Sequence, residues 1–140
     1  MQVKNNKELN FRSDCPISCA LDLIGDKWSI LIIRDLCFFE KRTFSQFALS
    51  DEKIAANILA DRLKKFEDYG IVTKGKSLEN KKTVLYTITP KGLDFVPVIL
   101  ELVLWGAKHL DSHITDEAKS FARKIKENKE AVIKKVNTYE

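Results

Sequence analysis

Three cysteines and two histidines are the residues of this 140-residue chain whose side chains could form a covalent or metal-bound centre. Cys15 stands at the start of an expected helix, where backbone N–H groups favour the reactive thiolate, although Asp14 beside it opposes that charge. Cys19 follows one helical turn later, but two cysteines four residues apart on an ideal helix rarely meet disulfide geometry. Cys37 ends an apolar helix and is expected to be a small buried residue. The cysteines therefore allow a thiol switch centred on Cys15.

The other polar residues show no pattern of a metal or catalytic site. His109 and His113 stand four residues apart without a third ligand nearby, and the chain has no Cys-x-x-Cys pair. The five glycines are scattered singly, so they form no phosphate-binding loop. We therefore expect no enzyme activity, no metal and no cofactor, and a thiol-based redox enzyme is a weaker interpretation of the cysteines.

The basic residues are concentrated in the middle of the chain. The whole sequence carries a formal net charge of +4, yet Lys53 to Lys91 alone hold nine Lys and Arg against four Asp and Glu. This segment therefore has a charge of +5 and the rest of the chain −1. A local excess of this kind is typical of a surface that binds a polyanion, and the simpler alternative is a solvated lysine-rich face.

Length and hydropathy favour one soluble domain. The chain is long enough to bury a core, and no apolar run reaches the ~18 residues of a membrane span. Residues 1–13 are polar, lack the apolar stretch of a signal peptide and are expected to form a flexible arm. The odd number of cysteines fits a reducing compartment, so we expect a cytoplasmic protein with no membrane partner.

The apolar spacing predicts mainly helices, with one hairpin between them. Pro16 suits the first turn of a helix that Gly25 ends, and Asp26 can cap the next helix. Pro97 predicts a kink in a long helix after the hairpin. The expected helices cover residues 16–24, 27–36, 44–49, 54–69 and 90–109, with one more from 115 onward, and the expected strands cover 71–77 and 83–89.

The helices at 44–49 and 54–69, joined by a short polar stretch, form a helix-turn-helix pattern. Gly70 is expected to close the second helix in the left-handed conformation, and the hairpin that follows has a basic tip in which Asn80 is available for a positive φ. The pattern predicts an α+β fold that is mainly α, namely a winged helix-turn-helix with flanking dimerisation helices.

Residues 95–104 are almost continuously apolar, which is unusual for a helix on the surface of a monomer. We expect this helix to be buried, in part against a second copy of the chain. The last helix carries its own apolar stripe behind Thr115, with Asp116 and Glu117 placed favourably for the helix dipole. We interpret residues 111–140 as an extension that forms a dimer arm, and the alternative is a helix that folds back on its own domain.

The beginning of the domain resembles the HxlR-type winged helix-turn-helix repressors, a branch of the MarR-like group. The matching residues are Cys15-Pro16, Ala20-Leu21-Asp22 and Gly25-Asp26-Lys27-Trp28, and similar elements continue to about Leu110. The resemblance implies a bacterial homodimer that binds palindromic double-stranded DNA through residues 14–110 and regulates transcription. It also implies a sensor role for Cys15, because the matching cysteine responds to electrophiles or oxidants in some members. The inducer, a small molecule or an oxidant, is not specified by the residues.

The second helix of the pattern is the expected recognition helix, whose N-terminal half faces base edges. Its outward residues are expected to be Ala55, Ala56, Asn57, Ala60, Asp61 and Lys64. Family members usually carry longer polar side chains here; only Asn57 suits a bidentate contact with adenine. Phosphate contacts are expected from Arg42, Lys53, Arg62, Lys64, Lys81 and Lys82. The alternative is a winged-helix protein-interaction module without DNA binding, which the alanine-rich face supports.

Overall fold

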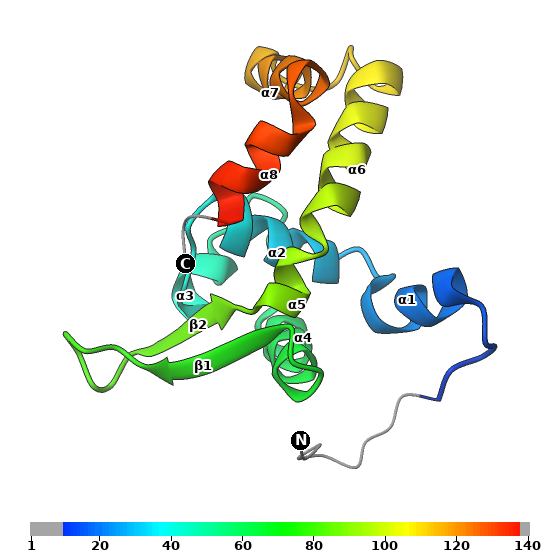
Figure 1. Ribbon diagram of the computed structural model, residues 1–140. Helices are drawn as coiled ribbons and strands as arrows, with labels where there is room; N and C mark the ends of the chain where they lie inside the picture. The colour runs from blue at the N-terminus through cyan, green and yellow to red at the C-terminus, as the bar shows by residue number, and fades with distance from the viewer. Residues whose placement is uncertain (1–9, 138–140) are drawn as a thin grey trace. The chain divides into compact units, whose positions relative to one another are not determined.

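The computed structural model describes residues 10–137, which form eight helices and one two-stranded antiparallel sheet (Figure 1). The chain divides into two compact units, one that ends at Thr89 and one that begins at Pro90. In the part of the chain that is described, no helix is both long and apolar enough to cross a membrane.

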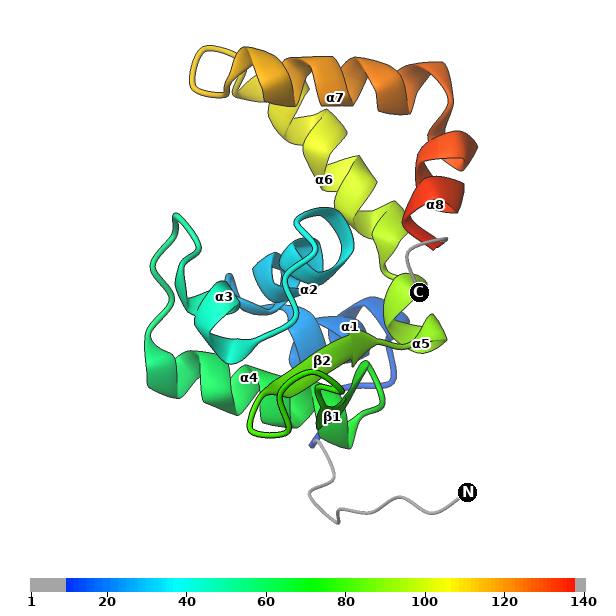
Figure 2. The same cartoon turned by 90° about the vertical axis from the view of Figure 1, so that its left-hand side faces the viewer.

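The first unit contains four helices and the hairpin. In chain order these are α1 (Pro16–Ile24), α2 (Ser29–Phe38), α3 (Phe44–Ala48), α4 (Ala56–Asp68), β1 (Val72–Lys76) and β2 (Val84–Ile88). Helix α4 packs against α3 and β1, and α2 packs against β2. The core of the unit is built from fully buried apolar residues on each of these layers: Ile33, Phe47, Leu59, Leu63, Phe66 and Val72. The mainly helical winged fold predicted from the sequence is confirmed (Figure 2).

The junction between α1 and α2 depends on a glycine and an aspartate. Gly25 ends α1 as predicted, but its φ is −78°, and the requirement is close approach: a Cβ there would lie 2.4 Å from the carbonyl oxygen of Leu21. The Asp26 carboxylate accepts from the backbone N–H groups of Trp28 at 2.9 Å and Ser29 at 3.0 Å. The predicted acceptance of N–H groups by Asp26 is confirmed, but the N-cap position is occupied by Trp28, and the helix begins later than expected, at Ser29.

A capping box begins α3. The Thr43 hydroxyl accepts from the backbone N–H of Gln46 at 3.2 Å, and the Gln46 side-chain oxygen accepts from the N–H groups of Thr43 at 3.1 Å and Arg42 at 2.7 Å. Helix α4 begins at Ala56, later than the predicted residue 54, because the turn before it remains extended through Ala55. Gly70 has a φ of 75°, so the predicted left-handed end of α4 is confirmed.

The hairpin pairs Val72 with Ile88 and Lys76 with Val84 in antiparallel register. At its tip the Asn80 side-chain oxygen accepts from the N–H of Lys82 at 3.1 Å. The positive φ expected for Asn80 is wrong: among the described non-glycine residues only Glu40 and Lys53 have one. Asn80 holds the turn through this side-chain bond instead, which needs no left-handed backbone.

The second unit contains α5 (Pro90–Leu93), α6 (Val96–His109), α7 (Asp116–Glu127) and α8 (Lys129–Asn137). The kink predicted at Pro97 is wrong, because the helix ends at Leu93 and a new helix begins at Val96. Pro97 lies in the first turn of this new helix, where its missing N–H has no cost. The single last helix predicted from residue 115 is also wrong. It is interrupted at Asn128, an extended residue whose side chain accepts from the N–H of Ala131 at 3.1 Å and begins α8.

Helices α7 and α8 pack against α6 of the same chain. The helix predicted to start at Thr115 begins at Asp116, and Thr115 is its N-cap, because its hydroxyl accepts from the N–H of Ala118 at 3.1 Å. The predicted apolar stripe includes the buried residues Ala122, Ile125 and Val136. The assignment of residues 111–140 to a dimer arm stays a prediction.

Candidate nucleic-acid interface

Helix α4 has one buried face and one exposed face. Leu59, Leu63 and Phe66 are buried against the core, with α3 on one side and β1 on the other. All six residues predicted to point outward are exposed: Ala55, Ala56, Asn57, Ala60, Asp61 and Lys64. The orientation deduced from the apolar spacing is therefore confirmed, and Asn57 offers an amide to whatever lies along this face.

The lysines predicted to contact phosphate lie at several places around this helix. Lys81 and Lys82 are exposed at the tip of the hairpin, and Lys53 is exposed in the turn before α4, with a φ of 57°. Lys64 is exposed on α4 but forms an ion pair with Asp68 at 3.0 Å. These four side chains can each reach an anion from the surface.

Arg62 has a different environment from these lysines. Its Nε lies 3.1 Å from Asp26 Oδ1 and its Nη1 lies 2.5 Å from Asp61 Oδ2, and the side chain is largely covered. Asp26 is the cap of α2, so this ion pair joins α4 to the beginning of α2. Arg62 thus holds α4 in place, through a contact that the spacing of the sequence did not predict.

The Asp26 carboxylate collects several donors. Besides the two backbone N–H groups, it accepts from the Ser29 hydroxyl at 2.6 Å, and its Oδ1 lies at ion-pair distance, 3.1 Å, from Arg62 Nε. Partial burial alone would raise the pKa of Asp26, but the hydrogen bonds from Ser29, Arg62 and the backbone N–H groups outweigh it and lower this pKa to about 2.

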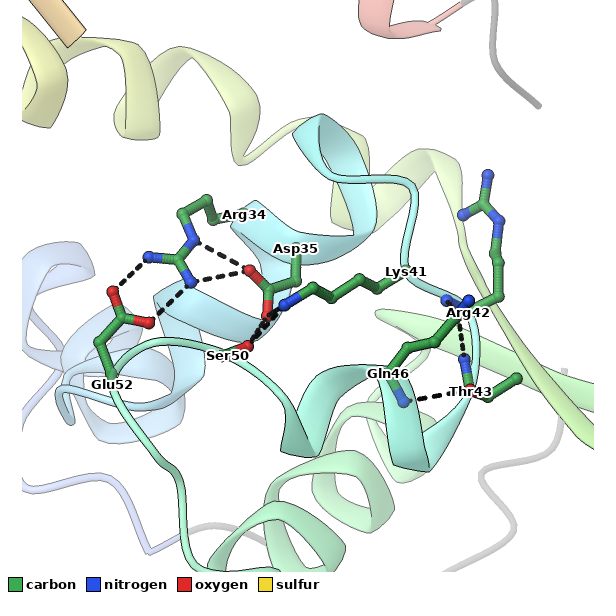
Figure 3. Close-up of polar contacts among 8 residues, drawn as sticks. All are labelled: Arg34, Asp35, Lys41, Arg42, Thr43, Gln46, Ser50 and Glu52. Carbon is green, nitrogen blue, oxygen red and sulfur yellow. Dashed lines mark hydrogen bonds and ion pairs between the residues drawn. The ribbon is translucent and has the colours of Figure 1, made fainter. Parts of the chain in front are cut away.

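Arg42, another predicted phosphate contact, is joined to the sheet by one backbone hydrogen bond. Its carbonyl accepts from the N–H of Tyr86 at 2.8 Å, which joins the loop before α3 to β2. Its side chain is half-buried, and its positive charge acts on the thiol of Cys37. Figure 3 shows the Arg42 side chain pointing away from the polar contacts around Thr43 and Gln46.

A charged cluster between α2 and the turn before α4 was missed by the sequence reasoning (Figure 3). The buried Asp35 carboxylate accepts from Ser50 Oγ at 2.5 Å, from Arg34 Nη2 at 2.8 Å and from Arg34 Nε at 3.0 Å. Lys41 Nζ lies 2.8 Å from Ser50 Oγ and 3.4 Å from Asp35. A signal was available, because Arg34 and Asp35 interrupt an apolar helix that must bury most of its residues.

The three cysteines are free thiols in different surroundings. Cys15 is exposed and is the residue immediately before α1. Cys19 is half-buried, and its S–H donates to the carbonyl of Ser13 at 3.2 Å. Cys37 is buried as predicted; burial raises the pKa of this thiol to about 12, against the opposing charge of Arg42. Since the thiolate is the reactive form, Cys37 is chemically inert and Cys15 is the accessible thiol.

Within residues 10–137 there is no group of three or more His, Cys, Asp or Glu side chains that could hold a metal ion. What the unit presents is a helix with an exposed face, preceded by a short helix and a turn, and followed by a basic-tipped antiparallel hairpin. This architecture defines the winged helix-turn-helix class of DNA-binding proteins.

The chain belongs to the HxlR-like helix-turn-helix family, whose family model matches residues 23–114. YdeP of Bacillus subtilis, an uncharacterised HTH-type transcriptional regulator, is 32% identical over 114 residues, which are 78% of this chain and 88% of YdeP. The HTH-type transcriptional regulator YodB of the same organism is 35% identical over 93 residues, 66% of this chain and 82% of YodB.

Solved structures of regulators with a similar fold agree with this family assignment. The reduced form of YodB shares 28% identity with a TM-score of 0.57, over 73% of this chain and 100% of YodB. The oxidised form of the redox regulator HypR shares 27% identity with a TM-score of 0.60, over 68% of this chain and 97% of HypR. The protein is therefore a helix-turn-helix transcriptional regulator, and a protein-interaction module without DNA binding is not favoured.

The lowered pKa of Asp26 makes the stability of the first unit depend on pH. Because the folded-state pKa is about 2 and the ordinary value is 3.8, the stabilisation is fully present above that ordinary value and is lost as pH falls through the folded pKa. We expect Asp26→Asn to lower the free energy of unfolding by about 2 kcal/mol at pH 7 and by about half as much at pH 3.

Urea denaturation followed by circular dichroism at the two pH values measures this difference. Asp51→Asn, which removes an exposed carboxylate from the same unit, is the control and should leave stability unchanged at both. A loss of equal size at both pH values would show that the charge of Asp26 is not what stabilises the junction.

Proposed function

We propose that the protein represses transcription in the cytoplasm by binding a palindromic operator as a homodimer, with α4 in the major groove and the hairpin along the phosphate backbone. The observation that carries this proposal is the exposed face of α4, which presents Asn57 and is followed by a hairpin with the exposed lysines Lys81 and Lys82 at its tip. Small side chains let the helix approach base edges closely, and alanine methyls suit thymine methyls. The exposed lysines of the turn and the hairpin supply sequence-independent affinity.

The hairpin lysines and Asn57 are expected to contribute in different ways. Lys81→Ala with Lys82→Ala should weaken binding to every duplex alike and flatten the salt dependence by about 0.9 log units per lost phosphate contact. Asn57→Ala should instead reduce the preference for the operator, by ~1–3 kcal/mol if the amide makes two bonds to one base.

Gel shifts with a duplex selected from random DNA by the wild-type protein, and with a scrambled duplex, test both variants over a range of salt concentrations. An unchanged salt slope in the double-lysine variant would remove the hairpin tip from the DNA contact. Failure of the wild-type protein to select any duplex would contradict the proposed function itself.

The homodimer is supported by an apolar stripe on α6. Val98, Leu102 and Trp105 are 45%, 50% and 60% exposed, and their spacing places them on one helix face. Val96, Ile99 and Leu100 on the other side are buried. An exposed stripe of this kind on a helix that is otherwise core is typical of a subunit interface. In the dimer, the two copies of α4 would meet successive major grooves roughly 34 Å apart or a multiple of it.

Leu102→Lys is expected to convert the dimer into a monomer, because it places a charge at the centre of the stripe. Multi-angle light scattering at micromolar concentration should give a two-chain mass for the wild type and a one-chain mass for this variant. Lys108→Glu changes an exposed residue of the same helix beside the stripe and should remain dimeric. A one-chain mass for the wild type would refute the interface.

We also propose that oxidation or alkylation of Cys15 releases the protein from DNA. Two structurally similar proteins support this proposal: HypR is described as a redox regulator, and YodB has a crystal structure described as quinone-bound. Cys15 is exposed and directly precedes α1, whose apolar side chains Ile17 and Leu21 are also exposed. An adduct or an intersubunit disulfide at this position would alter the surface around α1 and with it the spacing of the two recognition helices.

Treatment with diamide is expected to lower the operator affinity of the wild type by about tenfold and to leave Cys15→Ser unaffected. The reaction should become faster as the pH rises, because the thiolate attacks. Mass spectrometry identifies the modified residue. Full affinity of a wild-type protein shown to be modified at Cys15 would make this cysteine structural, and equal losses in both proteins would transfer the effect to another thiol.

A further inference from the structure

Few side chains of the turn between α3 and α4 are buried against the core. Leu49, Asp51, Glu52 and Lys53 are exposed, and Ile54 is only half-buried. A small cavity of about 10 Å³ lies under the turn, lined by Ile32, Phe47 and Ile54 among others. Apolar contacts therefore do not determine where this segment runs.

The first turn of α4 lacks the usual means of fixing a helix start. Its N-cap residue is Ala55, which forms no side-chain hydrogen bond to the free N–H groups. The first core residue in the helix is Leu59, one turn further on. Ala56 and Asn57, which lie between these two points on the exposed face, depend on the preceding turn for their position.

That turn is tied to α2 at two points. Ser50 bonds to the buried Asp35, as described above, and Glu52 forms a two-pronged ion pair with Arg34. Arg34 Nη1 lies 2.8 Å from Glu52 Oε2, and Arg34 Nη2 lies 2.9 Å from Glu52 Oε1 (Figure 3). The N–H of Lys53 donates to the carbonyl of Ser50 at 2.9 Å, a bond that spans both tied residues and closes the turn.

The Arg34 guanidinium is fixed by contacts other than the one with Glu52. Its Nε and Nη2 both donate to Asp35, and its plane lies over the Phe39 ring, 5.0 Å from the centroid. A planar guanidinium that already donates two hydrogen bonds loses little conformational entropy when it binds a second carboxylate. The hydrogen bond from Arg34 also lowers the pKa of Glu52, so the ion pair persists to a more acidic pH than a free glutamate carboxylate would allow.

We propose that Glu52 and Arg34 are positioning residues that set the first turn of the recognition helix and thereby the preference of the protein for its operator. This inference rests on the proposed function for its effect on DNA binding. Base-edge contacts depend on hydrogen bonds of restricted length and direction and are lost when the helix shifts, whereas lysines on flexible stems follow the phosphates. Breaking the pair therefore weakens binding to the operator and leaves non-specific binding in place.

Glu52→Gln tests this with a change of one charge and almost no change of shape. Glu67→Gln is the matched control, because Glu67 also forms an ion pair, with Lys74 at 3.6 Å, but lies at the far end of α4. We expect the ratio of affinities for the selected and scrambled duplexes to fall roughly threefold to tenfold in Glu52→Gln and to stay unchanged in Glu67→Gln. Arg34→Gln also removes a partner from the buried Asp35, so it should lose at least as much, and adding Glu52→Gln to it should cause no further loss.

Amide hydrogen exchange on the free protein provides a second measurement that needs no operator. Residues 53–58 should exchange faster in Glu52→Gln, while residues 59–66 remain as protected as in the wild type. An unchanged affinity ratio overturns the inference, and so does an equal fall in both affinities together with a lower melting temperature, which would mark a merely structural role. If the wild type selects no duplex, the proposed function fails, and exchange then decides the positioning role: faster exchange at 53–58 supports it and unchanged exchange overturns it.

Discussion

A single buried charge organises the polar structure of the first unit. The Asp35 carboxylate is 2% exposed, and a carboxylate removed from water is stable only when cations and donors surround it. Arg34 comes from the same helix, Lys41 from the loop after it and Ser50 from the turn before the recognition helix. Satisfying one carboxylate therefore brings three segments together, and the path of the chain into α4 follows from that requirement.

Most elements could be predicted because their signals are local. Apolar spacing identified α1 to α4, the left-handed Gly70 ended α4, and the Thr115 hydroxyl began α7. The exposed face of α4 was predicted for the same reason, since helical periodicity fixes which residues point outward. Pro97 could not be assigned from the sequence, because a proline is compatible both with a kink and with the first turn of a new helix.

The contacts that could not be predicted join residues distant in the sequence. Arg62 looks like a phosphate-binding residue in the sequence, yet in the fold it meets the cap of another helix, Asp26. Glu52 belongs to the short polar stretch between the two helices of the pattern, and the sequence does not indicate that its partner is Arg34 on α2. Ion pairs of this kind leave no periodic pattern, so only the packed structure separates basic residues that hold the fold from those that face solvent.

The two faces of α4 are made of different residues, and this separation has an evolutionary consequence. Leu59, Leu63, Phe66 and Arg62 hold the helix in place, whereas the side chains of Ala56 and Asn57 lie in solvent. Substitutions on the exposed face therefore cost little folding free energy, and most surface changes of this type are nearly neutral for stability. After gene duplication, copies of such a regulator can diverge in the DNA sequence they recognise without first having to acquire compensating changes in the core.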